Sequence, residues 1–195
     1  GGDAPFVGRR MEVHAVVRAC MSHGLTTVHG PAGIGKSAVV FEAARFMRQR
    51  HCFAHGIYVV NLEGVRAMKK ILSALNGALH ISATRASELA RKLAQYRRCL
   101  IVLDRCETAV RLAPKQFNWF LATLLKESHV SVLVSSKVAL PRDAQEIIGA
   151  GGGVGEVEVG ALPHADAALL LVKAMRSQGR CLRASEVGLA DRDEG

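Results

Sequence analysis

The sequence lacks any apolar run near the length of about 20 residues that a membrane-spanning helix needs. Its longest purely apolar runs, such as Cys99 to Leu103, have the length of buried strands. A signal peptide is also missing, but the chain opens at Gly1 without a methionine, so this second absence carries little weight. We expect a processed or excised segment with no membrane contact.

Cysteine pairs are absent too. The five cysteines are scattered, and no two of them form a C-x-x-C pair. This pattern favours reduced thiols in an intracellular, cytoplasmic protein over a disulfide framework. The cysteines that fall in apolar strand and helix patterns are expected in the core. The group formed by His51, Cys52 and His55 has no fourth ligand at zinc-site spacing, so a metal centre is not predicted there.

Aromatic residues make up only 5% of the chain, whereas its formal net charge is +9. No long basic run is interleaved with aromatic residues, which is the pattern that single-stranded nucleic acid binding favours. The Lys and Arg residues are spread over predicted helices instead, as is typical of a solvated basic face. Nucleic acid therefore stays open as a partner but is not favoured.

What the chain does have is a phosphate-binding loop. Residues 30–37 read G-P-A-G-I-G-K-S and fit G-x-x-x-x-G-K-[ST] without a mismatch. Such glycines let backbone N–H groups close around a phosphate. Lys36 can reach the β- and γ-phosphates, and the Ser37 hydroxyl can ligate Mg²⁺. We predict nucleotide contacts along the whole loop: Gly30, Pro31, Ala32, Gly33, Ile34, Gly35, Lys36, Ser37 and Ala38.

The pattern around this loop is that of an α/β domain. A β-branched strand at 25–29 precedes the loop, and a helical pattern from Lys36 to Arg50, with Phe46 on its apolar side, follows it. These two neighbours argue against a chance match in a glycine-rich turn. Further strands are predicted at 56–62, 99–104, 130–135 and 155–159. Helices are predicted at about 9–23, 65–79, 87–98, from 114 onward, at 141–148 and at 164–177.

This alternation indicates a parallel sheet with helices on both faces. Trp119 stands beside the apolar stripe of the helix that starts near Pro114, and we expect it to pack there. The glycine-rich segment 149–155 leads into a strand instead of following one, so it predicts a linker and no second nucleotide loop. We place a P-loop nucleotide-binding domain at 1–160 and the truncated start of a following helical segment at 161–195.

A phosphate loop needs a carboxylate across the site for Mg²⁺, usually at the end of a neighbouring apolar strand. Residues 100–104 read L-I-V-L-D. Asp104 is thus the predicted Walker B acid and, with Ser37, a metal ligand; a strand-terminal turn residue is the alternative. Glu107 is the candidate base for the attacking water, or else the start of the next helix. Lys36, Asp104 and Glu107 are our candidate catalytic residues.

The strand at 130–135 is followed by further polar groups. Ser136 and Lys137 could contact the γ-phosphate and register whether it is present. A surface turn is the alternative, because Ser is common in turns.

Together these motifs resemble the STAND class of P-loop NTPases, which is related to AAA+ ATPases and includes NB-ARC, NACHT and AfsR-like ATPase domains. Residues 6–12, F-V-G-R-R-M-E, resemble the opening motif F-V-G-R-x-x-E of that class. Residues 100–107, L-I-V-L-D-R-C-E, resemble its L-L-V-L-D-N-C-E. Residues 132–140 are similar to its sensor strand and turn, and residues 162–167 to its L-x-x-x-[ED]-A segment. The resemblance covers residues 6 to about 172.

The resemblance implies a three-layer P-loop domain whose five parallel strands have the order 5-1-4-3-2, and it implies ATP or ADP with Mg²⁺. It places Val7 and Arg9 on the adenine and ribose side. It also implies a regulatory switch that acts on downstream domains of the same polypeptide, with assembly of several copies on activation. Two departures matter: Arg105 replaces Asn or Asp and puts hydrolysis in doubt, and Lys137 replaces the sensor Arg.

Three alternatives stay open. A DNA-associated AAA+ ATPase of the replication-initiator type can show a similar opening motif. A P-loop small-molecule kinase would need an Arg-bearing lid, for which Arg142 is thin support. A scaffold that binds no nucleotide is hinted at by Arg105 alone.

Overall fold

The computed structural model describes residues 6–96, 98–140 and 153–177. The chain divides into two compact units. The larger unit is residues 11–159, and the smaller one combines residues 1–10 with residues 160–195. The predicted helix at 141–148, the first part of the predicted linker and the last eighteen residues lie outside the described part of the chain.

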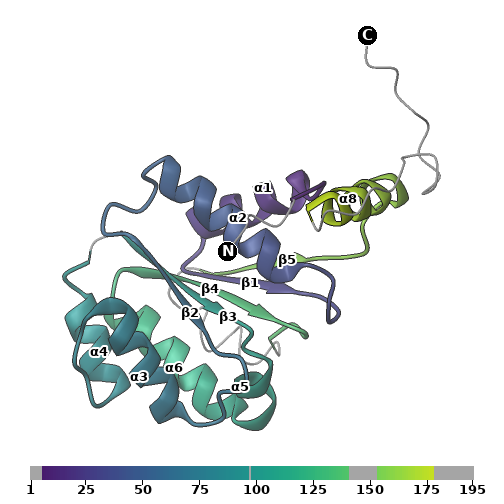
Figure 1. The fold of residues 1–195 in the computed structure, drawn as a ribbon. Coiled ribbons are helices and arrows are strands. Elements are labelled where there is room, and N and C mark those ends of the chain that lie inside the picture. The colour runs from purple at the N-terminus through teal and green to yellow at the C-terminus, as the bar shows by residue number, and fades with distance from the viewer. Residues whose placement is uncertain (1–5, 97, 141–152, 178–195) are drawn as a thin grey trace. The chain divides into compact units, whose positions relative to one another are not determined.

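Five parallel strands form the sheet of the larger unit. They are β1 (Leu25–His29), β2 (Ile57–Asn61), β3 (Cys99–Asp104), β4 (Val130–Ser136) and β5 (Val154–Glu158). Their order is β2-β3-β4-β1-β5, so the α/β class and the order 5-1-4-3-2 are confirmed. All strands run in the same direction (Figure 1). Their carboxyl ends therefore meet along one edge.

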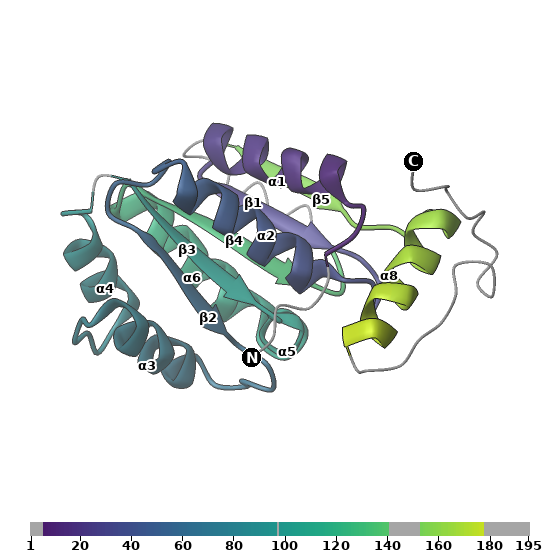
Figure 2. The ribbon, with the colours of Figure 1, turned by 45° about the horizontal axis from the view of Figure 1, so that its top comes forward.

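Helices cover both faces of this sheet. On one face α1 (Arg10–Ser22) and α2 (Lys36–Gln49) lie side by side, and the other face carries α3 (Met68–Leu79), α4 (Ala86–Leu93), α5 (Glu107–Leu112) and α6 (Pro114–Glu127) (Figures 1 and 2).

Alternating side chains of β3 fill the two cores on either side of the sheet. Ile101 and Leu103 face the α3, α4 and α6 side, whereas Leu100 and Val102 face the α1 and α2 side. A strand that is buried on both faces needs a continuous apolar run. This requirement explains why β3, in the interior of the sheet, consists of the apolar run Cys99 to Leu103 followed by Asp104.

The helix bounds differ from the predicted ones in three places. The helix predicted from residue 65 begins at Met68, because the chain first makes a turn in which Val65 N donates to Leu62 O at 3.0 Å. The helix predicted over 87–98 ends at Leu93. A separate short helix, α5, lies directly before α6, and Glu107 is its first residue.

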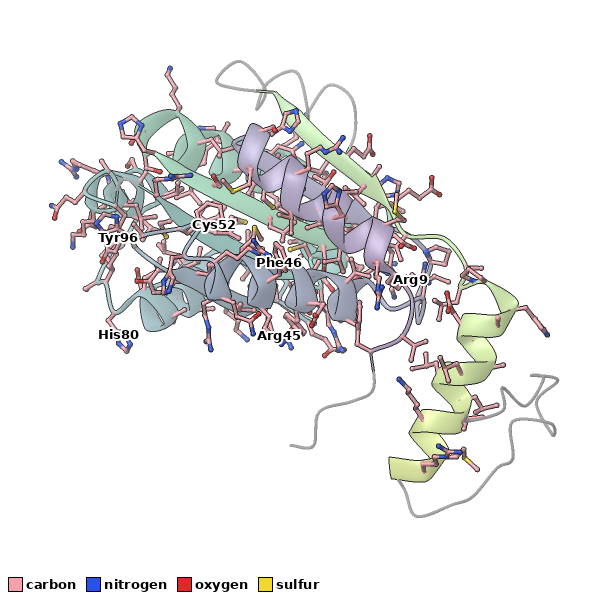
Figure 3. The ribbon with its side chains drawn as sticks, turned by 90° about the horizontal axis from the view of Figure 1, so that it is seen from above. Arg9, Arg45, Phe46, Cys52, His80 and Tyr96 are labelled. Carbon is pink, nitrogen blue, oxygen red and sulfur yellow. The ribbon has the colours of Figure 1, made fainter. Side chains whose placement is uncertain are left out.

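Two large side chains do not pack where the sequence predicted. Phe46, labelled on α2 in Figure 3, is 37% exposed. The Arg50 guanidinium lies 4.6 Å from the centre of its ring. Trp119 is 62% exposed, although Phe117 and Phe120 beside it are buried. Trp119 is two positions after Phe117, which is roughly 200° around a helix, so it points away from the core face of α6.

Four cysteines lie in the described residues, and all four are free thiols. The core role is confirmed for Cys20 and Cys99, which lie in the predicted helix and strand patterns and are buried; Cys106 is buried as well. Burial raises the pKa of the Cys20 thiol to about 11 and that of Cys99 to about 12, so both are neutral at physiological pH. Cys181 lies outside the described part of the chain.

The smaller unit contains α8 (His164–Ser177) and the opening segment Phe6–Arg10. Gly8 has φ +65°, and a Cβ atom there would lie 2.7 Å from Asp166 Oδ2 and 3.2 Å from Leu162 Cδ2. The two motifs at 6–12 and 162–167, far apart in the sequence, therefore contact each other. None of the described helices, in either unit, has the length and apolar character to cross a membrane.

A matched pair of glycine substitutions tests the packing of the larger unit. Gly30 has φ +151°, and its Cβ would lie 2.4 Å from the Val159 carbonyl oxygen. Gly77 lies within α3 and has open space around it. We expect Gly30→Ala to lower the free energy of unfolding by on the order of 2–3 kcal/mol. Gly77→Ala should raise it by about 0.5–1 kcal/mol. Urea denaturation measures both free energies of unfolding. A Gly30→Ala variant as stable as the parent chain or as Gly77→Ala would contradict the contact with Val159.

Candidate functional site

A cavity of about 410 Å³ lies at the carboxyl ends of β3 and β4, beside the first turn of α2. Predicted site residues that line it are Ala32, Gly33, Gly35, Lys36, Ser37, Ala38, Glu107 and Lys137. Four further lining residues were not among them: Glu63, Gly64, Thr108 and Ser135. Arg105, which the sequence singled out only as a departure from the family pattern, lines the cavity as well. Gly30, Pro31, Ile34, Asp104 and Ser136 do not line it.

The loop between β1 and α2 adopts a conformation that needs glycine. Gly33 and Gly35 have φ +75° and +99°, a region that side-chain-bearing residues avoid, although a Cβ at either would meet nothing within 4 Å. Gly35 is the N-cap of α2 and supplies no side-chain cap. The first N–H groups of this 14-residue helix thus lack a capping side chain at the cavity wall. This arrangement suits an anion.

Lys36 is buried beneath this loop, with 7% of its surface exposed. Its Nζ donates to the carbonyl oxygens of Gly30 and Pro31, at 2.8 Å each. Burial lowers the pKa of Lys36; the Glu107 and Asp104 carboxylates oppose this shift and Lys137 adds to it. The ammonium group is therefore held at the cavity wall by two backbone oxygens.

Asp104 ends the buried strand β3, and its carboxylate is 2% exposed. Its Oδ1 accepts hydrogen bonds from Ser37 Oγ, at 3.0 Å, and from Ser135 Oγ. Ser135 Oγ in turn accepts from the backbone N–H of Arg105 at 2.9 Å. One carboxylate oxygen thus links the ends of β3 and β4 to the start of α2.

The chemistry of this cluster fits a magnesium ion. The described residues contain no group of three or more His, Cys, Asp or Glu side chains able to hold a metal alone. Mg²⁺ needs no such cage, because it is usually held by one or two protein oxygens together with phosphates and water. The Ser37 hydroxyl and the Asp104 carboxylate are such oxygens.

Ser136 and Lys137 follow each other at the end of β4. Ser136 is 3% exposed, lies beside His29 in the register of β1 and β4, and is part of the strand, not of a surface turn. Its hydroxyl has no hydrogen-bond partner among the described residues. Lys137 is exposed and lines the cavity.

An exposed ion pair joins two lining residues of the cavity, one after β2 and one after β3. The Arg105 guanidinium pairs with the Glu63 carboxylate, and Arg105 Nε lies 3.9 Å from Asp104 Oδ2. Arg105 also has φ +59°, which is unusual for a residue with a side chain. Glu63 could have been found from its place just after a parallel strand, because ligand sites form beyond such carboxyl ends.

Of the remaining predicted site residues, Glu107 lines the cavity, whereas Val7 and Arg9 do not. Glu107 is the first residue of α5 and also lines the cavity, so both readings of it are compatible with its position. Val7 and Arg9 belong to the smaller unit, whereas the cavity belongs to the larger one. Their contact with a nucleotide stays a prediction.

The sequence model of the family described as Novel STAND NTPase 1 matches residues 2–147 of the chain. A comparison with curated proteins finds no match.

Solved structures share the fold of the chain. The chain is similar to the Walker-type ATPase PABY2304 of Pyrococcus abyssi, with a TM-score of 0.67 and 15% identity over 93% of this chain. It is also similar to the ORC1 protein of Aeropyrum pernix in complex with DNA, with a TM-score of 0.65 and 18% identity over 89% of this chain. The chain spans 61% and 50% of those two chains. At these identities the likeness establishes the fold.

A serine pair on β4 tests the hydrogen bonds around Asp104. Ser135→Ala removes a donor to the buried carboxylate and an acceptor for Arg105 N–H. We expect it to lower the free energy of unfolding by about 1–3 kcal/mol. Ser131→Ala, on the same strand but with no side-chain hydrogen bond in the described residues, should change it by less than about 0.5 kcal/mol. Equal effects in urea denaturation would show that the network does not stabilise the fold.

Proposed function

Because the chain belongs to the Novel STAND NTPase 1 family, we propose that its larger unit binds ATP or ADP with Mg²⁺ in the cavity beside α2. We further propose that it is the regulatory nucleotide switch of a larger signalling protein. The observation that carries the proposal is the meeting of three features: an uncapped helix start, a buried lysine and a hydroxyl–carboxylate pair.

The loop and Lys36 would bind the phosphates. The backbone N–H groups at the start of α2, which has no side-chain cap, would donate to an anion without rearrangement of side chains. Lys36 would exchange its bonds to the Gly30 and Pro31 carbonyls for phosphate oxygens. The exchange is favourable because a bond between two charged groups is stronger than a bond to a neutral carbonyl.

Ser37 and Asp104 would hold the metal ion. When bound, Mg²⁺ neutralises charge on the β- and γ-phosphates. The Ser37 hydroxyl and the Asp104 carboxylate already face each other at 3.0 Å. Ser135 fixes the orientation of this carboxylate by donating to the same oxygen.

The far side of the cavity would distinguish ATP from ADP. Lys137 lines the cavity and is a cation without a fixed fork geometry. The Ser136 hydroxyl beside it is buried, has no partner among the described residues and does not line the cavity, so it would reach a phosphate only after a local rearrangement. The pair of Arg105 with Glu63 is exposed and therefore weak, so a γ-phosphate can compete for the guanidinium. Such a change of partners is the kind of local event that biases neighbouring domains in nucleotide switches. The downstream domains of the polypeptide and further copies of the chain are the partners we propose.

Hydrolysis would be slow. Glu107 is the candidate base, from the first turn of α5. The Arg105 side chain, 3.9 Å from the Asp104 carboxylate at its Nε, competes with a metal ion for that carboxylate. Slow turnover prolongs the ATP-bound state, which suits a switch.

A second candidate function is DNA-associated ATPase activity of the replication-initiator type. The formal net charge of +9 favours it, as does the similarity of fold to an ORC1 protein in complex with DNA. Arg142, the residue on which the small-molecule kinase depends, lies outside the described residues. Titration with duplex DNA separates the two candidates: salt-sensitive binding in the low micromolar range or tighter would favour the initiator type.

Calorimetric titration of ATP and ADP with Mg²⁺ tests the nucleotide site. We expect saturable binding of both, weakened at least about tenfold by Lys36→Ala, because the buried cation is lost from the phosphate site. Lys126→Ala, which removes an exposed lysine of α6, should leave binding unchanged. A folded chain, extended by its downstream domains, that binds neither nucleotide would refute the switch and favour a scaffold.

Steady-state ATP hydrolysis tests the role of Arg105. We expect Arg105→Asn to raise the rate about tenfold, because the Asp104 carboxylate no longer faces a competing cation. Asn also tolerates the left-handed backbone at this position better than Arg, so stability should not fall. Arg111→Asn, on the exposed side of α5, is the control. A lower rate for Arg105→Asn would mean instead that the guanidinium assists the reaction.

A further inference from the structure

A second and larger hollow, of about 670 Å³, lies among α3, the start of α4 and the start of α6. It shares no lining residue with the nucleotide cavity. The three helices lie on the same side of the sheet (Figure 2). We call this hollow the α3–α6 groove.

The lining of the α3–α6 groove is largely apolar. Phe120 and Ala86 are buried, and Met68 and Leu72 are half-buried. The Trp119 ring lines it as well while 62% exposed. Trp119 is the only tryptophan of the chain. An exposed tryptophan beside a hollow with an apolar lining is the usual anchor of a protein–protein contact.

The charged lining residues are all cations. Among the residues that the structure describes, Lys69, Arg85 and Lys115 line the α3–α6 groove, and no acidic residue does. None of the three forms an ion pair within the described residues. Glu88, in the first turn of α4, does not line the groove; it accepts from Thr84, which does, and pairs with Lys92 at 3.2 Å.

We propose that the α3–α6 groove binds an acidic amphipathic segment of a partner polypeptide. Its carboxylates would pair with Lys69, Arg85 and Lys115, and a large apolar side chain would pack against Trp119. The arrangement matches the way in which amphipathic helices lie in grooves, with apolar anchors on one face and charges on the other. This surface goes beyond nucleotide binding and does not depend on it.

The charges favour this occupant over others. A second copy of the chain would also carry a formal net charge of +9, so two copies repel each other. Nucleic acid would satisfy the three cations, but it would leave the aliphatic side chains of Met68 and Leu72 without an apolar partner. An acidic amphipathic segment satisfies both the cations and the apolar lining.

The test uses the fluorescence of Trp119 with the chain titrated by a synthetic helical peptide of about four turns. The peptide carries Leu along one face and Glu along the other. We expect a saturable blue shift of the emission, because the indole leaves water. The double variant Lys69→Glu/Lys115→Glu should bind at least about tenfold more weakly. The matched control Lys70→Glu/Lys126→Glu makes the same change of charge on α3 and α6 outside the groove, and it should bind like the parent chain.

Circular dichroism of each variant establishes that it is folded. Lys36→Ala should bind the peptide like the parent chain, because Lys36 lies at the nucleotide cavity and not at the groove. Four outcomes would overturn the proposal. They are an absence of saturable binding, equal weakening by both double variants, equal binding of a peptide in which Lys replaces each Glu, and equal binding of one in which Ser replaces each Leu. Self-association that Trp119→Ser abolishes would instead assign the groove to a second copy, and tighter binding of single-stranded DNA would assign it to nucleic acid.

Discussion

The carboxylate of Asp104 holds together the parts of the nucleotide cavity. It stands at the end of a strand buried on both faces, where an unpaired charge would be costly. Two serine hydroxyls satisfy one of its oxygens, one from α2 and one from β4. Because both donors lie in regular elements, the carboxylate fixes the start of α2 relative to the strands. Backbone hydrogen bonds join the same strand ends: Leu62 N donates to Asp104 O at 2.8 Å, and Cys106 N donates to Ser135 O at 2.9 Å.

The features that the sequence predicted well are those that a local pattern determines. The apolar run that ends in an acid forms β3, whose last residue is Asp104. The glycine loop leads directly into α2, with Gly35 as its N-cap. The order of the strands came from resemblance alone, because nothing in the local pattern of a parallel strand says which neighbour it pairs with. The family and the P-loop fold implied by the resemblance are confirmed.

The failures have physical causes as well. Trp119 was expected to pack because it stands beside the apolar stripe of α6, but its angle around the helix relative to Phe117 turns it away from the core. Glu63 has no motif of its own and reaches the cavity only through the pairing of β2 with β3. Its ion pair with Arg105 joins residues 42 positions apart in the sequence, which no local pattern encodes. The contacts of Val7 and Arg9 with a nucleotide, and the predicted boundary at residue 160, stay predictions.

Val159, at the end of the larger unit, contacts the chain on both sides of the start of the phosphate loop. Its N–H donates to His29 O at 2.8 Å, and its own carbonyl oxygen occupies the space that a side chain on Gly30 would need. It is also the last residue of the larger unit, and the chain continues from it directly into the smaller one. A force on the backbone at residue 160 therefore reaches the first residue of the loop through one peptide unit and one hydrogen bond. The first residue of the phosphate loop thus lies against the backbone at the point where the chain leaves the sheet, and a displacement of either would disturb the other.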